Sequence, residues 1–486
     1  MLRSTPDWRF LAAVAIVSAA IFWAFLAKAS PPTPVESGRL LAALTLAAVG
    51  LGPAGWRGRG LLLHSALFAW LILNLHQARW LGILTTNLNA NWEWSSAHFA
   101  SNDYWVFYHA AQDTYVLGRS PYVVGNHFPI PTYWLIHLLA GSGRLPIEWA
   151  GTLFWGVNFI IIVAVVGGSL MLLRQVRPAS QVASILFLMI LVLSNPVLAS
   201  WAMGQTIILA LGFWFVGIVV WDRGRSPWRE IGCAASFVVA GMIKPPLLIF
   251  MGAFGVRAAI ETLMVILRRR TKISGSARVG WWSVAFFAGL IGTAVCLPGG
   301  VTWETFWQFS RIVHSTLATA GRSQVFNFSL PFVLMNKLDK AGILSLDRWI
   351  DLVNLLLGGL GATVFAKRLG PNPASFRDIA PGLLIPPFVF GAFWSYYSAW
   401  FFPYLLWCGW LTLDQAIPPK AQAMAWAGLA LLQVFSSPLF LVGVSLLLLA
   451  GDYARGQPCS SDGRSVGYIS GHEGPLRKRS TTSRFG

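Results

Sequence analysis

Acidic side chains are scarce in this chain: Asp and Glu account for 18 of its 486 residues, against 36 Lys and Arg. Charged residues of both signs make up only 11% of the sequence, whereas 56% of it is hydrophobic. Soluble globular domains carry about 25% charged residues. The composition therefore excludes an ordinary soluble globular protein.

Cysteine is rarer still, with four residues in the whole chain. Cys233, Cys296, Cys408 and Cys459 do not show the spacing of a metal site or a redox motif. The chain also lacks an Asp-x-Asp pair, so metal-assisted chemistry on a nucleotide sugar has no support in the sequence. We expect no metal and no cofactor.

Long apolar runs dominate what is present. A helix needs about 20 apolar residues to cross the hydrocarbon core of a membrane. These runs are continuous rather than alternating, which indicates helices rather than barrel strands. The main runs are 10–27, 61–75, 149–173, 185–199, 207–221, 282–297, 352–366, 379–393 and 400–413. The sequence predicts an all-α polytopic integral membrane protein with about 11–14 transmembrane helices.

The excess of positive charge lies in short loops between these runs. Cytoplasmic loops of membrane proteins are enriched in Lys and Arg. The net charge of +18 therefore indicates how the chain is oriented in a membrane. We predict membrane lipids as partners, and no nucleic acid. Residues 1–451 then form one transmembrane domain, with two large outer loops at about 85–148 and 298–347. Residues 452–486 form a disordered basic cytoplasmic tail.

The first outer loop carries the sequence Ser-Asn-Asp-Tyr-Trp at 101–105. From Tyr104 to Tyr115, apolar and aromatic residues recur at spacings of three and four, which predicts an amphipathic helix on the membrane surface. Asn102 is a suitable N-cap, and Asp103 then lies in the first turn, where the helix dipole favours a carboxylate. Asp103 is a candidate general base; the alternative is a helix-terminal carboxylate without chemistry.

Two polar residues mark other outer turns. Lys244 precedes two prolines at the tip of a predicted helical hairpin, where its charge could hold a phosphate; the alternative is a lysine that extends into the headgroup region. Gln205 ends a Gly-Gln turn at the start of an apolar run and is a candidate hydrogen-bond donor to the same phosphate. Both residues are therefore candidates for binding a phosphorylated ligand.

The second outer loop contributes Arg311, His314 and Arg322. Arg311 and His314 are three residues apart and share a face if the segment is helical. They are candidates for a phosphate clamp, and the alternative is solvated surface charge.

Several short stretches, in the same order along the chain, resemble a known family. They are Asn102-Asp103-Tyr104, Ala110-Ala111, Gly118-Arg119-Ser120-Pro121-Tyr122, Asn195-Pro196, Gly204-Gln205 and 240–246. Together they resemble glycosyltransferase family 87, whose members are polyprenol-phosphate-mannose-dependent mannosyltransferases of the GT-C class.

This resemblance implies a GT-C fold and an inverting, metal-independent transfer of a sugar, most simply mannose, from a polyprenyl-monophosphate donor. The acceptor would be a lipid-linked or glycan hydroxyl outside a bacterial-type plasma membrane. Asp103 matches the family's catalytic aspartate and Lys244 its lysine at the outer turn. The late loop lacks the family's histidine, and Tyr396, Tyr397 or His314 would take its place. Expected sugar or acceptor contacts are Asn102, Tyr104, Tyr108, Tyr122 and Tyr397.

Two other classes of function remain open. A transporter or lipid flippase would want ionisable residues in the middle of its spans, and few are visible here. A lipid-linked glycan polymerase or ligase would also have large outer loops, but we would expect it to use arginines and a histidine there rather than a first-loop aspartate.

Overall fold

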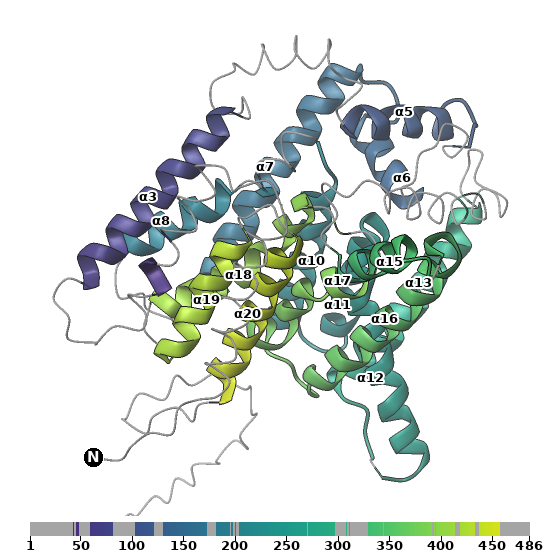
Figure 1. The fold of residues 1–486 in the computed structure, drawn as a ribbon. Coiled ribbons are helices and arrows are strands. Elements are labelled where there is room, and N and C mark those ends of the chain that lie inside the picture. The colour runs from purple at the N-terminus through teal and green to yellow at the C-terminus, as the bar shows by residue number, and fades with distance from the viewer. Residues whose placement is uncertain are drawn as a thin grey trace, which may run out of the picture.

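The computed structural model describes the following parts of the chain: residues 42, 45–47, 59–80, 103–120, 130–172, 181–194, 196–197, 200, 204–269, 271–296, 308, 311, 329–343, 345–390, 393, 395–413, 418–432 and 437–456. Within them the chain is built of helices and short connections, without a strand (Figure 1). The prediction of an all-α protein is confirmed for this part of the chain.

The helices of the first half are α3 (Arg59–Trp80), α5 (Asp103–Tyr115), α6 (Ile130–Leu139), α7 (Ile147–Leu172), α8 (Gln181–Val192), α10 (Ile207–Arg223), α11 (Trp228–Ile243), η2 (Pro245–Leu247), α12 (Leu248–Ile266) and α13 (Gly275–Cys296). Those of the second half are α15 (Leu330–Lys340), α16 (Leu346–Arg368), η3 (Ser375–Ile379), η4 (Ala380–Leu384), α17 (Pro386–Val389), η5 (Ser395–Phe401), α18 (Phe402–Leu413), α19 (Pro419–Leu431) and α20 (Ser437–Gly456).

The centre of the molecule is the pair α10 and α11, which pack along each other. A Cβ on Gly217 of α10 would come within 2.8 Å of the Phe237 ring, so the absence of a side chain there lets α11 approach closely. Phe237 also lies beside Trp214 and Phe250, with ring centroids 6.3 and 5.3 Å away. Aromatic burial on this scale makes this region the core of the fold.

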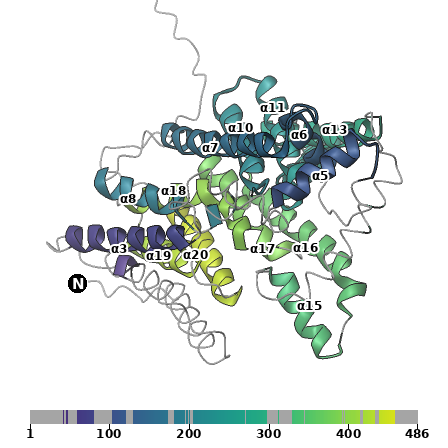
Figure 2. The same ribbon diagram turned by 90° about the horizontal axis from the view of Figure 1, so that it is seen from above.

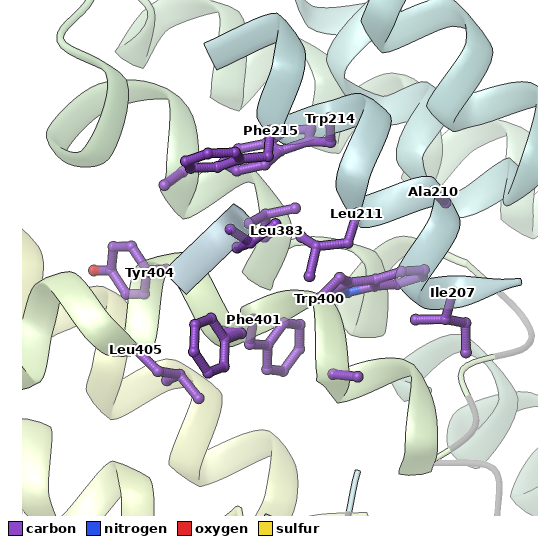
Figure 3. Packing of buried hydrophobic residues seen from close by; sticks show 14 of the residues in the cluster. Ile207, Ala210, Leu211, Trp214, Phe215, Leu383, Trp400, Phe401, Tyr404 and Leu405 are labelled. Carbon is purple, nitrogen blue, oxygen red and sulfur yellow. The ribbon is translucent and has the colours of Figure 1, made fainter. Parts of the chain in front are cut away.

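A second set of aromatic side chains closes the core from η5 and α18. Figure 3 shows Trp400 of η5 beside Ile207 and Leu211 in the first turns of α10. Trp400 and Phe401 are fully buried, which fixes the late segment of the chain against α10. Residues almost two hundred positions apart in the sequence are thereby brought to one place.

Three helical segments are long and apolar enough to cross a membrane: Trp149–Leu172, Pro245–Ile266 and Trp349–Arg368. Large apolar side chains such as Ile160 on α7 and Leu355 on α16 are exposed, as expected where a helix faces lipid. The predicted number of 11–14 spans reaches beyond these three segments and stays a prediction.

One predicted apolar span is wrong. The run 379–393 is not a continuous helix: it breaks into η4 and the four-residue α17. Pro381, Pro386 and Pro387 account for the break, because a proline inside a helix removes a backbone donor and clashes with the preceding turn. The helix in the run 185–199 is also shorter than this run predicts, because α8 ends at Val192.

The basic loops meet at one end of the bundle, the end to which α12 descends in Figure 1. Arg278 of α13 donates to Glu230 of α11 at 2.7 Å, and the Trp221 indole of α10 donates to the carbonyl of Pro373 at 2.8 Å. The connections α10–α11, α12–α13 and α16–η3 therefore lie together. These connections carry three of the basic clusters, at 223–229, 268–278 and 367–377, and the cytoplasmic side predicted for them stays a prediction.

Helices α5 and α6 lie at the opposite end (Figure 1). The Thr132 hydroxyl of α6 donates to the carbonyl of Ile243, the last residue of α11, at 3.3 Å. Figure 2, a view from above, shows α5 and α6 grouped beside α11 and α13. The segment that holds α5 and α6 is thus joined to the turn that carries Lys244.

Glu230 is expected to stabilise the basic end strongly. It is fully buried, and its Oε1 lies 2.7 Å from Arg278 and 3.5 Å from Arg229. Glu230→Ala leaves both guanidinium groups without this carboxylate, and because Arg278 keeps partial access to solvent we expect a loss of roughly 2 kcal/mol in the free energy of unfolding. Denaturation of the full chain in detergent measures it. The control is Asp339→Ala, because Asp339 is exposed on α15. Equal losses of unfolding free energy in the two variants would contradict a stabilising role for Glu230.

Candidate functional site

Lys244 lies at the junction of α11 and η2 and is the centre of a buried polar site. Its backbone N–H closes α11 by donating to the carbonyl of Ala240, and Pro245 and Pro246 then turn the chain into η2. The side chain is only 1% exposed. The alternative of a lysine extended into the headgroup region is therefore wrong: the cation points into the protein.

Gln205 is the first partner of this lysine. The Lys244 ammonium donates to Gln205 Oε1 at 3.2 Å. Gln205 is held in front of α10 by its own backbone N–H, which donates to the carbonyl of Ser200 at 2.9 Å. Gly204 has a φ of +65°, a conformation that favours glycine, so the Gly-Gln turn presents the amide to Lys244. Two residues expected from the sequence to share a ligand are in contact.

Tyr397 of η5 is the second partner. Its ring centroid lies 5.1 Å from Lys244 Nζ, within the range of a cation–π interaction. The tyrosine ring is itself held by Phe393 and Trp400, with centroids 5.7 and 5.2 Å away. The three predicted residues Lys244, Gln205 and Tyr397 thus come from separate parts of the sequence to one cluster, which we call the Lys244 cluster.

Asp103 is the first residue of α5, as the sequence predicts. On the same helix, the Tyr104 ring stacks on Phe154 of α7 at 4.8 Å, and the Tyr108 hydroxyl donates to the carbonyl of Leu145 at 2.8 Å. Burial raises the pKa of Tyr104, and neighbouring Tyr108 adds to the rise. Tyr104 therefore stays a neutral phenol that positions α5 and does not serve as a base.

Two residues from the segments predicted to be outer loops, Ser120 and Gln308, are in contact. The Ser120 hydroxyl, in the stretch after α5, donates to Gln308 Oε1 at 2.8 Å. Arg311, three residues further, is helical and exposed. The contact brings the Gly-Arg-Ser stretch of the first loop to the start of the second, on the side of the molecule where α5 lies.

The remaining predicted site residues, Asn102, Tyr122, His314 and Arg322, lie outside the described residues. Among the described ones, no group of three His, Cys, Asp or Glu side chains comes together as a metal site would require. The chemical character of the Lys244 cluster is that of a buried cation with polar and aromatic neighbours, suited to an anionic group.

Sequence reasoning missed Thr206 and Trp400. Both are fully buried, and neither Thr206 Oγ1 nor Trp400 Nε1 has a hydrogen-bond partner. A signal for Thr206 exists in the sequence, since threonine directly before an apolar helix is a common N-cap. Nothing local marks Trp400, because its place beside α10 depends on tertiary packing.

Comparison of the chain with protein-family models, with curated proteins and with solved structures gives no match.

Proposed function

We propose that the protein is a polytopic membrane glycosyltransferase that moves a sugar, mannose in the simplest case, from a polyprenyl-monophosphate donor to a hydroxyl group of a lipid-linked or glycan acceptor. The observation that carries the proposal is Lys244: a lysine that is 1% exposed, bonded to Gln205 and at the end of the bundle where α5 begins with Asp103. A buried ammonium beside an amide and an aromatic ring is suited to an anionic ligand, since opposite charge offsets the cost of burying a cation.

The charge of the cluster fits this donor class. A sugar linked to a lipid through one phosphate carries a single negative charge, and Lys244 supplies a single positive one. Their attraction is much stronger in a partly dry groove than in water. When the sugar leaves, the phosphate gains a further negative charge, and a cation already in place stabilises that charge without reorganisation.

Asp103 is the proposed general base. The acceptor oxygen bonds to the anomeric carbon, the bond from that carbon to the phosphate oxygen breaks, and the leaving phosphate keeps the electron pair. The proton of the acceptor hydroxyl passes to the Asp103 carboxylate. A helix N-terminus favours the ionised carboxylate that this step needs, and attack opposite the phosphate inverts the configuration.

The lipid chain of the donor would lie in the membrane. The three long apolar segments support membrane insertion, and their exposed apolar faces would contact the isoprenoid tail. The basic end would face the cytoplasm by the positive-inside rule, which leaves the Lys244 cluster and α5 at the outer face of a bacterial-type plasma membrane.

Transfer itself is the direct test. The purified full chain in nanodiscs is incubated with radiolabelled polyprenyl-phosphate mannose or glucose and a set of lipid-linked and glycan acceptors. We expect label to move to an acceptor from one of these donors without added metal. Movement of the intact lipid between leaflets without transfer would indicate a flippase, and transfer only from a diphosphate-linked glycan would indicate a polymerase or ligase; either result would contradict the proposal.

The orientation gives a separate prediction. Arg144, between α6 and α7, and Lys272, between α12 and α13, are exposed at opposite ends of the bundle. In a variant whose native cysteines are replaced by serine, Arg144→Cys should react with a membrane-impermeant thiol reagent in intact cells. Lys272→Cys should react only after permeabilisation, because its end faces the cytoplasm. The reverse pattern would place the Lys244 cluster on the cytoplasmic side.

A further inference from the structure

The N-terminus of α10 opens directly onto the Lys244 cluster. α10 runs from Ile207 to Arg223 over 17 residues, and the two residues before it are Gln205 and Thr206. The first N–H groups of a helix have no partner within the helix. Thr206 stands at the N-cap position, yet its side chain makes no capping hydrogen bond. The usual means of satisfying these donors is therefore not used.

Two buried donors adjoin this helix end. Gln205 is 1% exposed and Thr206 is 0% exposed, and neither Gln205 Nε2 nor Thr206 Oγ1 has a hydrogen-bond partner. The bond from Lys244 to Gln205 Oε1 fixes the amide so that Nε2 is the free half of the side chain. A buried polar group without a partner is costly, and two in sequence at a helix N-terminus are explained by a ligand that accepts from both.

We propose that Gln205, Thr206 and the first-turn amides of α10 bind one phosphate group, with Lys244 as its counter-charge. This rests on the proposed function, in which that group belongs to the lipid donor, and it adds Thr206 as a phosphate-binding residue. The free amides and the dipole of a helix N-terminus favour an anion. A phosphate offers several acceptor oxygens in different directions, as donors arriving from a threonine, a glutamine and a helix end require.

The proposed site should bind the phosphate of the product more tightly than the phosphate of the donor. A phosphate monoester carries close to two negative charges at neutral pH, whereas the sugar-linked phosphate carries one. The helix N-terminus and Lys244 together therefore hold the product phosphate more tightly than the donor phosphate. This is the order expected of a site that stabilises charge as it develops on the leaving group.

Thr206→Val separates this role from a structural one, because it removes the hydroxyl and keeps the shape. The hydroxyl has no partner in the protein, so its loss should leave the thermal stability of the ligand-free protein unchanged or higher. Affinity for farnesyl monophosphate, measured by calorimetry on the full chain in nanodiscs, should fall about tenfold. Affinity for farnesol, which lacks the phosphate, should not change.

Two further variants serve as controls. Thr206→Ser keeps a hydroxyl and should retain most of the affinity for farnesyl monophosphate. Thr363→Val makes the same substitution on α16, where the hydroxyl only donates to its own helix at Gly359, and should bind the probe as the wild type does.

The outcomes are decisive in each direction. Equal affinity of Thr206→Val and wild type for farnesyl monophosphate, or a wild type that binds it no better than farnesol, overturns the phosphate site. A loss of affinity together with a loss of thermal stability also overturns it, since Thr206 would then be structural. If the phosphate-specific loss occurs but no sugar is transferred from any donor, the site stands and the glycosyltransferase proposal fails.

Discussion

Asp103→Asn should reduce sugar transfer by about a thousandfold, within the range of about 10²–10⁴ that general acid–base catalysis contributes. Asparagine has nearly the same size and still accepts hydrogen bonds, but it does not take a proton at neutral pH. Acceptor and donor would bind as before while the acceptor hydroxyl keeps its proton. The measurement is the initial rate of label transfer in nanodiscs at saturating donor and acceptor.

The matched control for this variant lies on the same helix. Asp113 is on α5, ten residues after Asp103, and Asp113→Asn removes one carboxylate from the same region. It should leave transfer close to wild type. The Asp103→Asn protein should also bind farnesyl monophosphate as the wild type does, because the phosphate site does not include Asp103. A wild-type rate of transfer in Asp103→Asn would remove Asp103 from the mechanism.

The local elements of the site follow well from the sequence. Spacing of apolar residues and the position of Asn102 predict a helix from Asp103, and α5 begins there. The Pro-Pro pair after Lys244 predicts the hairpin tip that separates α11 from η2 and α12. Both features depend on short-range rules of capping and of proline geometry, which a single sequence carries.

Contacts between residues far apart in the chain are harder to predict from the sequence. The sequence places Lys244 at a turn, where exposure is the usual outcome, but packing of α6 and η5 around this turn buries it. The contact of Tyr397 with Lys244 joins positions that no periodicity connects, and the sequence suggests Tyr397 only through the family resemblance. The error at 379–393 has a local origin: the apolar content predicts a span, but three prolines interrupt the helix.

Lys244→Gln should lower kcat/KM for the lipid donor about a hundredfold or more, because it removes the charge that faces the phosphate in both the ground state and the transition state. Loss of one preorganised group of this kind costs about 10²–10³ in kcat. Lys244→Arg should not restore activity: the guanidinium is larger and planar, and the Lys244 side chain is buried in contact with Gln205 and Tyr397. The measurement is transfer as a function of donor concentration.

A second lysine and a double substitution with Gln205 test whether Lys244 acts on the phosphate. Lys367→Gln changes an exposed lysine at the basic end and should leave kcat/KM near wild type, which tests whether net charge alone matters. Because Lys244 Nζ and Gln205 Oε1 are in contact, Lys244→Gln combined with Gln205→Ala should lose less than the sum of the single effects. Strict additivity of the two substitutions, or a wild-type donor dependence in Lys244→Gln, would mean that the buried lysine serves the fold and not the phosphate.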